Sequence, residues 1–102
     1  MKTWQTPELK KLAKAFLVLE KESDVLNFLR DLCTLEELEV LSKRWQVVEL
    51  LNKGVSYRLI AEKTGVSTAT VTRIAHWLTS GEGGYRAVVD KLLPKVGKFR
   101  RK

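Results

Sequence analysis

The sequence has very little of what several classes of protein depend on. Its 102 residues include one cysteine and one histidine. Cys33 alone excludes an internal disulfide and suggests a reducing compartment, and a structural zinc site would need more Cys or His ligands. No apolar run approaches the roughly 20 residues that a membrane span needs, and the first residues lack the apolar segment of a signal peptide. We therefore expect a cytoplasmic protein without metal, cofactor or membrane contact.

Positive charge is in excess, and much of it lies at the C-terminal end. The net charge is +7, with 19 basic and 12 acidic residues. Residues 94–102 contain basic but no acidic residues, which leaves 14 basic and 12 acidic groups in residues 1–93. A basic balance favours an anionic partner. The tail 94–102 is either a nucleic-acid arm or a solubilising end, and the sequence leaves both open.

Apolar residues recur with helical spacing along most of residues 1–93, and no strand hairpin is apparent. A first helix is predicted from Thr6-Pro7-Glu8 to about residue 19. Ser23 is expected to cap a second helix, whose buried residues would be Leu26, Leu29 and Leu32. Thr34 and Glu37 fit a capping box that opens a third helix, which stops at Gly54.

The third helix, from about residue 34 to 52, has apolar residues on more than one side. Such a helix is normally buried on more than one side. In so small a chain, a second copy of the protein would supply the extra burial. Further helices are predicted over about 56–63, 67–79 and from Tyr85 to the residue before Pro94. The sequence thus predicts an all-α domain of about six helices over 1–93.

The stretch 56–79 has the pattern of a helix-turn-helix. Gly65 falls where the turn needs a residue that tolerates positive φ. Ser67 can cap the second helix of the pair, while Ala61 is small where the two helices come closest. Val66 would fill the turn, and inward-facing Ile60, Val71 and Ile74 would lock the pair of helices together.

In this motif the start of the second helix meets base edges in the major groove. Hydroxyl groups there can bond to bases, and a methyl group can contact thymine. The start of the first helix can reach phosphates, which helix-start amides also favour. We therefore predict DNA contacts from Ser56, Tyr57, Arg58, Ser67, Thr68, Ala69, Thr72, Arg73 and His76.

Other interpretations of these residues stay open. The pair of helices also fits a protein-interaction domain without a DNA role. Thr70 and Thr72 can be plain exposed β-branched residues, and His76 can be surface without a function. An enzyme is not expected, because the single Cys33 and the single His76 fall in different helical contexts. The glycines at 81–84 lack the lysine and Ser/Thr of a phosphate-binding loop.

Residues 31–93 resemble the Trp repressor superfamily, with most similarity to its small bacterial YerC/YecD type. The resemblance is carried by Asp31-Leu-Cys-Thr34, Leu41-x-x-Arg44, Val47-Val-Glu-Leu-Leu51 and Thr70-Val-Thr-Arg73 around the helix-turn-helix. It implies an intertwined homodimer, in which the first three helices and the last exchange contacts between chains. It also implies a DNA-binding transcriptional regulator, most simply a repressor, that reads a near-palindromic operator. Carried over by position, the residues that would face DNA are Arg58, Thr68, Ala69, Thr70 and Thr72.

The resemblance also identifies the positions of the co-repressor pocket. There the tryptophan ligand lies between arginines that match Arg44 and Arg73, next to a threonine that matches Thr34. Ile74 stands where that family has glycine, and Trp77 where it has serine. Because close-packed sites tolerate little extra volume, we expect these two side chains to block the pocket and free tryptophan not to bind.

Two alternatives to an operator-binding regulator remain at this point. One is a DNA-binding module for replication or transposition, which would need a separate ATPase or nuclease domain. The other is a protein-interaction adaptor that makes no contact with DNA. For the pocket positions, Thr34 can simply be a cap, Arg44 can pair with an acid on its own helix, and Trp77 can be ordinary core.

Overall fold

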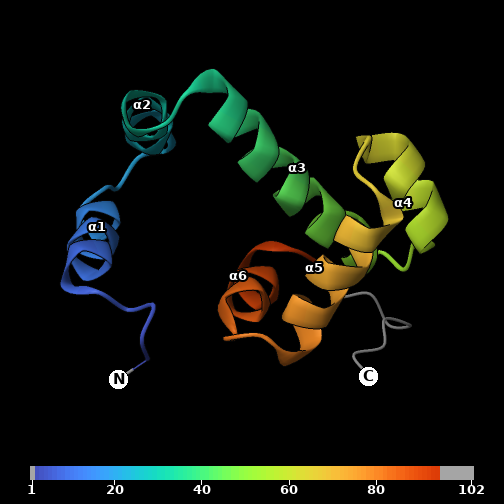
Figure 1. The fold of residues 1–102 in the computed structure, drawn as a ribbon. Coiled ribbons are helices and arrows are strands. Elements are labelled where there is room, and N and C mark those ends of the chain that lie inside the picture. The colour runs from blue at the N-terminus through green and yellow to red at the C-terminus, as the bar shows by residue number, and fades with distance from the viewer. Residues whose placement is uncertain (1, 95–102) are drawn as a thin grey trace. The chain divides into compact units, whose positions relative to one another are not determined.

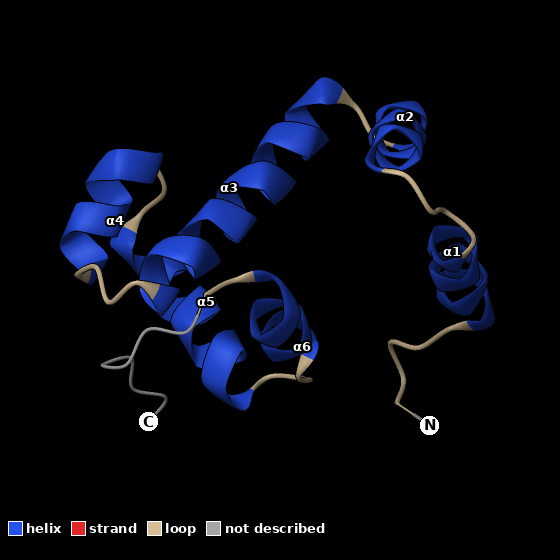
Figure 2. Ribbon diagram, turned by 180° about the vertical axis from the view of Figure 1, so that it is seen from behind, coloured by secondary structure: helices blue, strands red, loops and turns tan. Residues whose placement is uncertain are grey.

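The computed structural model describes residues 2–94 (Figures 1 and 2). These residues form helices and no strands. The helices are α1 (Pro7–Leu17), α2 (Glu22–Leu32), α3 (Leu35–Asn52), α4 (Tyr57–Thr64), α5 (Thr68–Ser80) and α6 (Gly84–Leu92). None of these helices has the length and apolar character that crossing a bilayer requires. The all-α prediction is confirmed, and the basic residues at 95–102 lie outside the described part.

Contacts between residues divide the chain into two compact units, residues 1–38 and residues 39–102. The first unit contains α1 and α2, neither of which has a buried residue. The two helices meet through Phe16 and Phe28, whose rings pack edge to face with centroids 5.1 Å apart. Leu26 and Leu32, which we expected to be buried, are 58% and 46% exposed in the protomer. Within one protomer these two side chains are not covered, because spacing identifies an apolar face but not what covers it.

The starts of α1 and α3 are stabilised as predicted. Thr6 accepts a hydrogen bond from the Leu9 amide at 3.1 Å, and Pro7 occupies the first helical position. Thr34 and Glu37 bond to each other's backbone amides at 3.1 and 2.9 Å, which is the reciprocal pattern of a capping box.

The predicted cap of α2 is wrong. This helix begins at Glu22 after Lys21, which makes no side-chain capping bond, and Ser23 lies inside the first turn. Glu22 and Asp24 instead place negative charge at the helix start. Acidic residues there interact favourably with the helix dipole, which compensates in part for the missing cap.

The core of the second unit is formed where α3, α4, α5 and α6 meet. Its fully buried side chains include Ile60, Val71 and Ile74, as the helix-turn-helix pattern predicted. The remaining buried apolar residues are Val47, Val48, Leu51, Leu78 and Val89. Helix α5 packs against both α4 and α6, so this core holds the second helix of the pair in place (Figure 1).

The turn between α4 and α5 has the predicted geometry. Gly65 ends α4 with φ at +82°, a backbone conformation that residues with a Cβ rarely adopt. Val66 packs against the core and Ser67 caps α5. The result is a short, defined connection that fixes how α5 leaves α4.

Candidate nucleic-acid interface

The starts of α4 and α5 are built in the same way. Ser56 accepts a hydrogen bond from the Leu59 amide at 3.2 Å, and Ser67 accepts one from the Thr70 amide at 3.1 Å. Neither helix has an acidic residue in its first turn. Each start therefore presents the positive end of a helix dipole without a neighbouring carboxylate in its own first turn, which is electrostatically favourable for an anion such as a phosphate.

The side chains predicted to contact DNA lie at the surface of the second unit. All are exposed except Thr70, which is half-buried, and they are Ser56, Tyr57, Arg58, Ser67, Thr68, Ala69, Thr70, Thr72, Arg73 and His76. Three of them belong to the start of α4 and the others to α5 or its cap. Opposite them, Val71 and Ile74 face the core. Helix α5 thus has one buried face and one accessible polar face.

Hydroxyl groups connect several of these residues along α5. The Ser67 hydroxyl donates to Thr70 Oγ1 at 3.1 Å, and Arg73 Nη2 donates to the same oxygen at 3.2 Å. The Thr72 hydroxyl donates to the backbone carbonyl of Thr68 at 3.0 Å. The hydroxyls and the guanidinium therefore form a contiguous polar surface over the first two turns of the helix.

The positions that match the co-repressor pocket have different surroundings in this protomer. Thr34 is engaged in its capping box in the first unit. In the second unit Arg44 and Arg73 are exposed, and Ile74 is fully buried in the core. Trp77 is 44% exposed. The added isoleucine side chain therefore occupies interior volume, whereas the indole of Trp77 lies at the surface.

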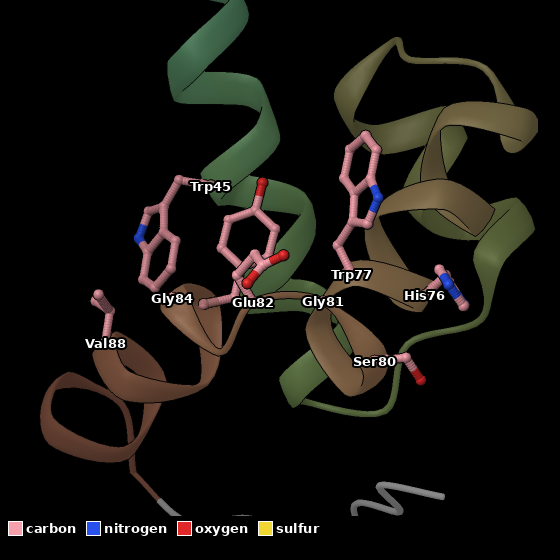
Figure 3. Close-up of a pocket in the computed structure, with 9 residues that line it drawn as sticks. Trp45, His76, Trp77, Ser80, Gly81, Glu82, Gly84 and Val88 are labelled. Carbon is pink, nitrogen blue, oxygen red and sulfur yellow. The ribbon is translucent and has the colours of Figure 1, made fainter. Parts of the chain in front are cut away.

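A cavity of about 750 Å³ lies beside Trp77 in the second unit. Trp45 from α3 and Tyr85 from α6 also line it, with ring centroids 6.5 Å apart. Figure 3 shows the indoles of Trp45 and Trp77 on either side of the cavity, while His76 and Ser80 point away from them. Neither arginine of the predicted ligand pocket lines this cavity.

Sequence reasoning missed three features of this region. Thr64 is buried and supports the turn, a role that its position directly before Gly65 could have indicated. Lys43 Nζ lies 3.7 Å from where a Cβ on Gly65 would stand, although the two are far apart in sequence. The aromatic cavity joins residues of three helices, and no local pattern predicts such a grouping.

Comparisons with known proteins agree with this architecture. The model of the family described as Trp repressor protein matches residues 7–93. The chain is 34% identical over 85 residues to the uncharacterized protein YerC of Bacillus subtilis (strain 168), covering 83% of this chain and 82% of that protein.

Solved structures give the same result. The crystal structure of a TrpR-like protein from Eubacterium eligens ATCC 27750 superposes with a TM-score of 0.80 at 36% identity, covering 90% of this chain and 95% of that one. A crystal structure from Staphylococcus aureus gives a TM-score of 0.78 at 34% identity, covering 87% and 89% of the two chains.

Proposed function

Because the chain belongs to the Trp repressor family, we propose that it is a sequence-specific DNA-binding regulator of transcription. Family membership indicates a DNA-binding regulator rather than an enzyme. The observation that carries the more specific proposal is the accessible polar face at the start of α5, which is held by the core through Val71 and Ile74. Repression is the simplest form of such regulation, because a protein bound at a promoter blocks access to it.

The proposed contacts divide into two groups. Ser56, Tyr57 and Arg58 at the start of α4 would hold phosphates, and so would Arg73 on α5. Thr68 and Ala69, at the start of α5, would meet base edges in the major groove. Phosphate contacts would supply most of the affinity, and base contacts would supply the specificity.

We also propose that the protein acts as a homodimer. Large apolar side chains are exposed on α1, α2 and the first half of α3, among them Leu9, Leu17, Leu26, Leu32, Val40 and Leu41. Large exposed apolar side chains in such number are typical of a surface that a partner covers. A second copy would cover it and would place two recognition helices about 34 Å apart, one turn of DNA. The operator would then be nearly palindromic.

Free tryptophan is not a co-repressor in this proposal. The side chain of Ile74 is fully buried where the family has a glycine that leaves room for a ligand. Close packing allows little adjustment around such a side chain. Trp77 adds an indole one helical turn after Arg73. Its bulk would fill further space at a position where the family has a serine.

The experiment that tests this function is selection of bound duplexes from a random pool by the full chain, with and without L-tryptophan. The proposal expects enrichment of one motif with two related half-sites one helical turn apart, and the same motif with and without the amino acid. Enrichment of no motif would contradict a sequence-specific regulator and favour an adaptor role. A motif that appears only with tryptophan would contradict the proposal that the pocket is blocked, but not the proposal that the protein is a sequence-specific regulator.

A further inference from the structure

We propose that Thr70 is a positioning residue for DNA binding, because its hydroxyl holds the guanidinium of Arg73 toward the start of α5, where that group would contact a DNA phosphate. This inference rests on the proposed function and assigns different roles in DNA binding to the two residues. Arg73 would touch the DNA backbone, and Thr70 would act on the DNA through Arg73.

The geometry of α5 produces this contact. Residues three apart lie on the same side of a helix, and side chains lean toward its N-terminus. Arg73 therefore reaches back one turn, and its Nη2 donates to Thr70 Oγ1 at 3.2 Å. The alternative direction for this side chain is outward into solvent, and the hydrogen bond selects the backward one. The guanidinium is thus held near the part of α5 that would enter the groove.

Thr70 is itself held in place. Its Oγ1 also accepts a bond from the Ser67 hydroxyl at 3.1 Å, and its backbone amide donates to Ser67 Oγ at 3.1 Å. Ser67 is the N-cap, so this anchor is fixed to the helix start. A hydroxyl oxygen has two lone pairs, and here both accept. Thr70 is half-buried while Arg73 is exposed, so the more buried side chain positions the exposed one.

The charges explain why the arrangement points to DNA rather than to the stability of the fold. A cation near the start of a helix is opposed by the positive end of the dipole. The first turn of α5 has no acidic residue, and Thr70 is a neutral partner. Among residues 2–94, Arg73 forms no salt bridge with a carboxylate. An anion would relieve this concentration of positive charge, and a guanidinium binds phosphate well through paired donors.

The hydrogen bond to Thr70 also directs the Arg73 side chain away from the cavity beside Trp77. Arg73 is not among the residues that line this cavity. Its hydrogen bond is to Thr70, which precedes it, while Trp77 follows it by one turn. Arg73 is therefore directed to the recognition end of α5 and not to this cavity.

The test is a double-mutant cycle between Thr70 and Arg73 in the full chain. Variants Thr70→Val, Arg73→Gln and the double variant are titrated by fluorescence anisotropy against a labelled random-sequence duplex of about 24 base pairs, long enough for two half-sites. Valine keeps the branched shape and replaces the hydroxyl with a methyl group. Thr70→Ser restores the hydroxyl, Thr70→Ala is a second deletion should valine perturb the helix, and Thr79→Val is the matched control at an exposed threonine near the end of α5.

We expect Arg73→Gln to weaken binding about tenfold at low salt and to reduce the salt slope by about one. Thr70→Val should weaken binding about threefold to fivefold, as expected for loss of a hydrogen bond to a charged group. The valine should have no further effect when Arg73 is already glutamine. Thr70→Ser and Thr79→Val should bind like the wild type.

Two results would overturn this inference while leaving the proposed function intact. One is an equal loss from Thr70→Val in the presence and absence of Arg73, since Thr70 would then act independently. The other is a wild-type affinity for DNA in Thr70→Val and Thr70→Ala, while Arg73→Gln binds DNA weakly. If the wild-type protein fails to bind duplex DNA even at low salt, the proposed function is wrong and the role of Thr70 is wrong with it.

Discussion

The hydroxyl of Thr64 donates a hydrogen bond of 2.8 Å to the backbone carbonyl of Ile60 in the buried interior of the second unit. The same oxygen accepts a bond from the Val66 amide at 3.3 Å. One hydroxyl therefore joins the last turn of α4 to the segment that leads into α5. This contact helps to keep the turn at Gly65 in a single conformation.

Thr64→Val tests the importance of this link. Valine fits the same space but leaves the Val66 amide without this partner, and an unpaired buried polar group costs about 1–3 kcal/mol. We expect the free energy of unfolding to fall by about that amount in urea denaturation. Thr79→Val, at an exposed threonine, should change it by less than about 0.5 kcal/mol. Equal effects at the two positions would contradict the role of Thr64.

Gly65→Ala tests the backbone of the turn. The φ of +82° disfavours any L side chain by roughly 1–2 kcal/mol, whereas the nearest atom to an added Cβ, Lys43 Nζ at 3.7 Å, is at an ordinary contact distance. Gly54 has the same φ and no atom within 4 Å of an added Cβ. Both alanine variants should therefore lose similar stability by denaturation, but only Gly65→Ala should also weaken DNA binding.

Leu41→Lys tests the proposed dimer. Leu41 is 46% exposed in the protomer, so a lysine there should cost little within one chain. In a dimer it would place a charge in an apolar interface, which is strongly unfavourable. We expect a dimer for the wild type and a monomer for this variant by sedimentation equilibrium. Thr79→Lys serves as the charge-matched control, and a wild-type monomer would contradict the dimer directly.

Titration calorimetry with L-tryptophan tests the blocked pocket. The buried side chain of Ile74 leads us to expect no saturable heat at micromolar concentrations of the amino acid. Saturable micromolar binding to the wild-type protein would show that Ile74 and Trp77 leave room for the ligand.

Ile74→Ala should lower the free energy of unfolding by about 2–5 kcal/mol, because it removes core contacts.

Local features were predictable from the sequence because they depend on neighbouring residues. The capping box at Thr34, the cap at Ser67 and the positive φ at Gly65 each follow from residue type at a fixed spacing. The inward face of α5 followed in the same way from its helical period. The cap of α2 was mispredicted because a serine can equally well lie in the first turn.

Features that depend on distant residues could not be predicted. The contact of Lys43 with the turn and the cavity that Trp45, Trp77 and Tyr85 line both require the packing of separate helices. The exposure of Leu26 in the protomer could not be predicted either, because spacing identifies an apolar face and tertiary or quaternary contacts decide what covers it. The hydrogen bond between Arg73 and Thr70 could be predicted only in part, because the spacing of the two residues permits it but does not require it.

The most direct test of the central claim is a salt titration of DNA binding by the wild-type chain, using the selected duplex and a scrambled duplex of equal length. A helix-turn-helix that reads DNA should bind the selected duplex much more tightly, and its affinity should fall steeply and linearly in a plot of log affinity against log salt. Equal affinity for the two duplexes, or an affinity that does not change with salt, would contradict the account.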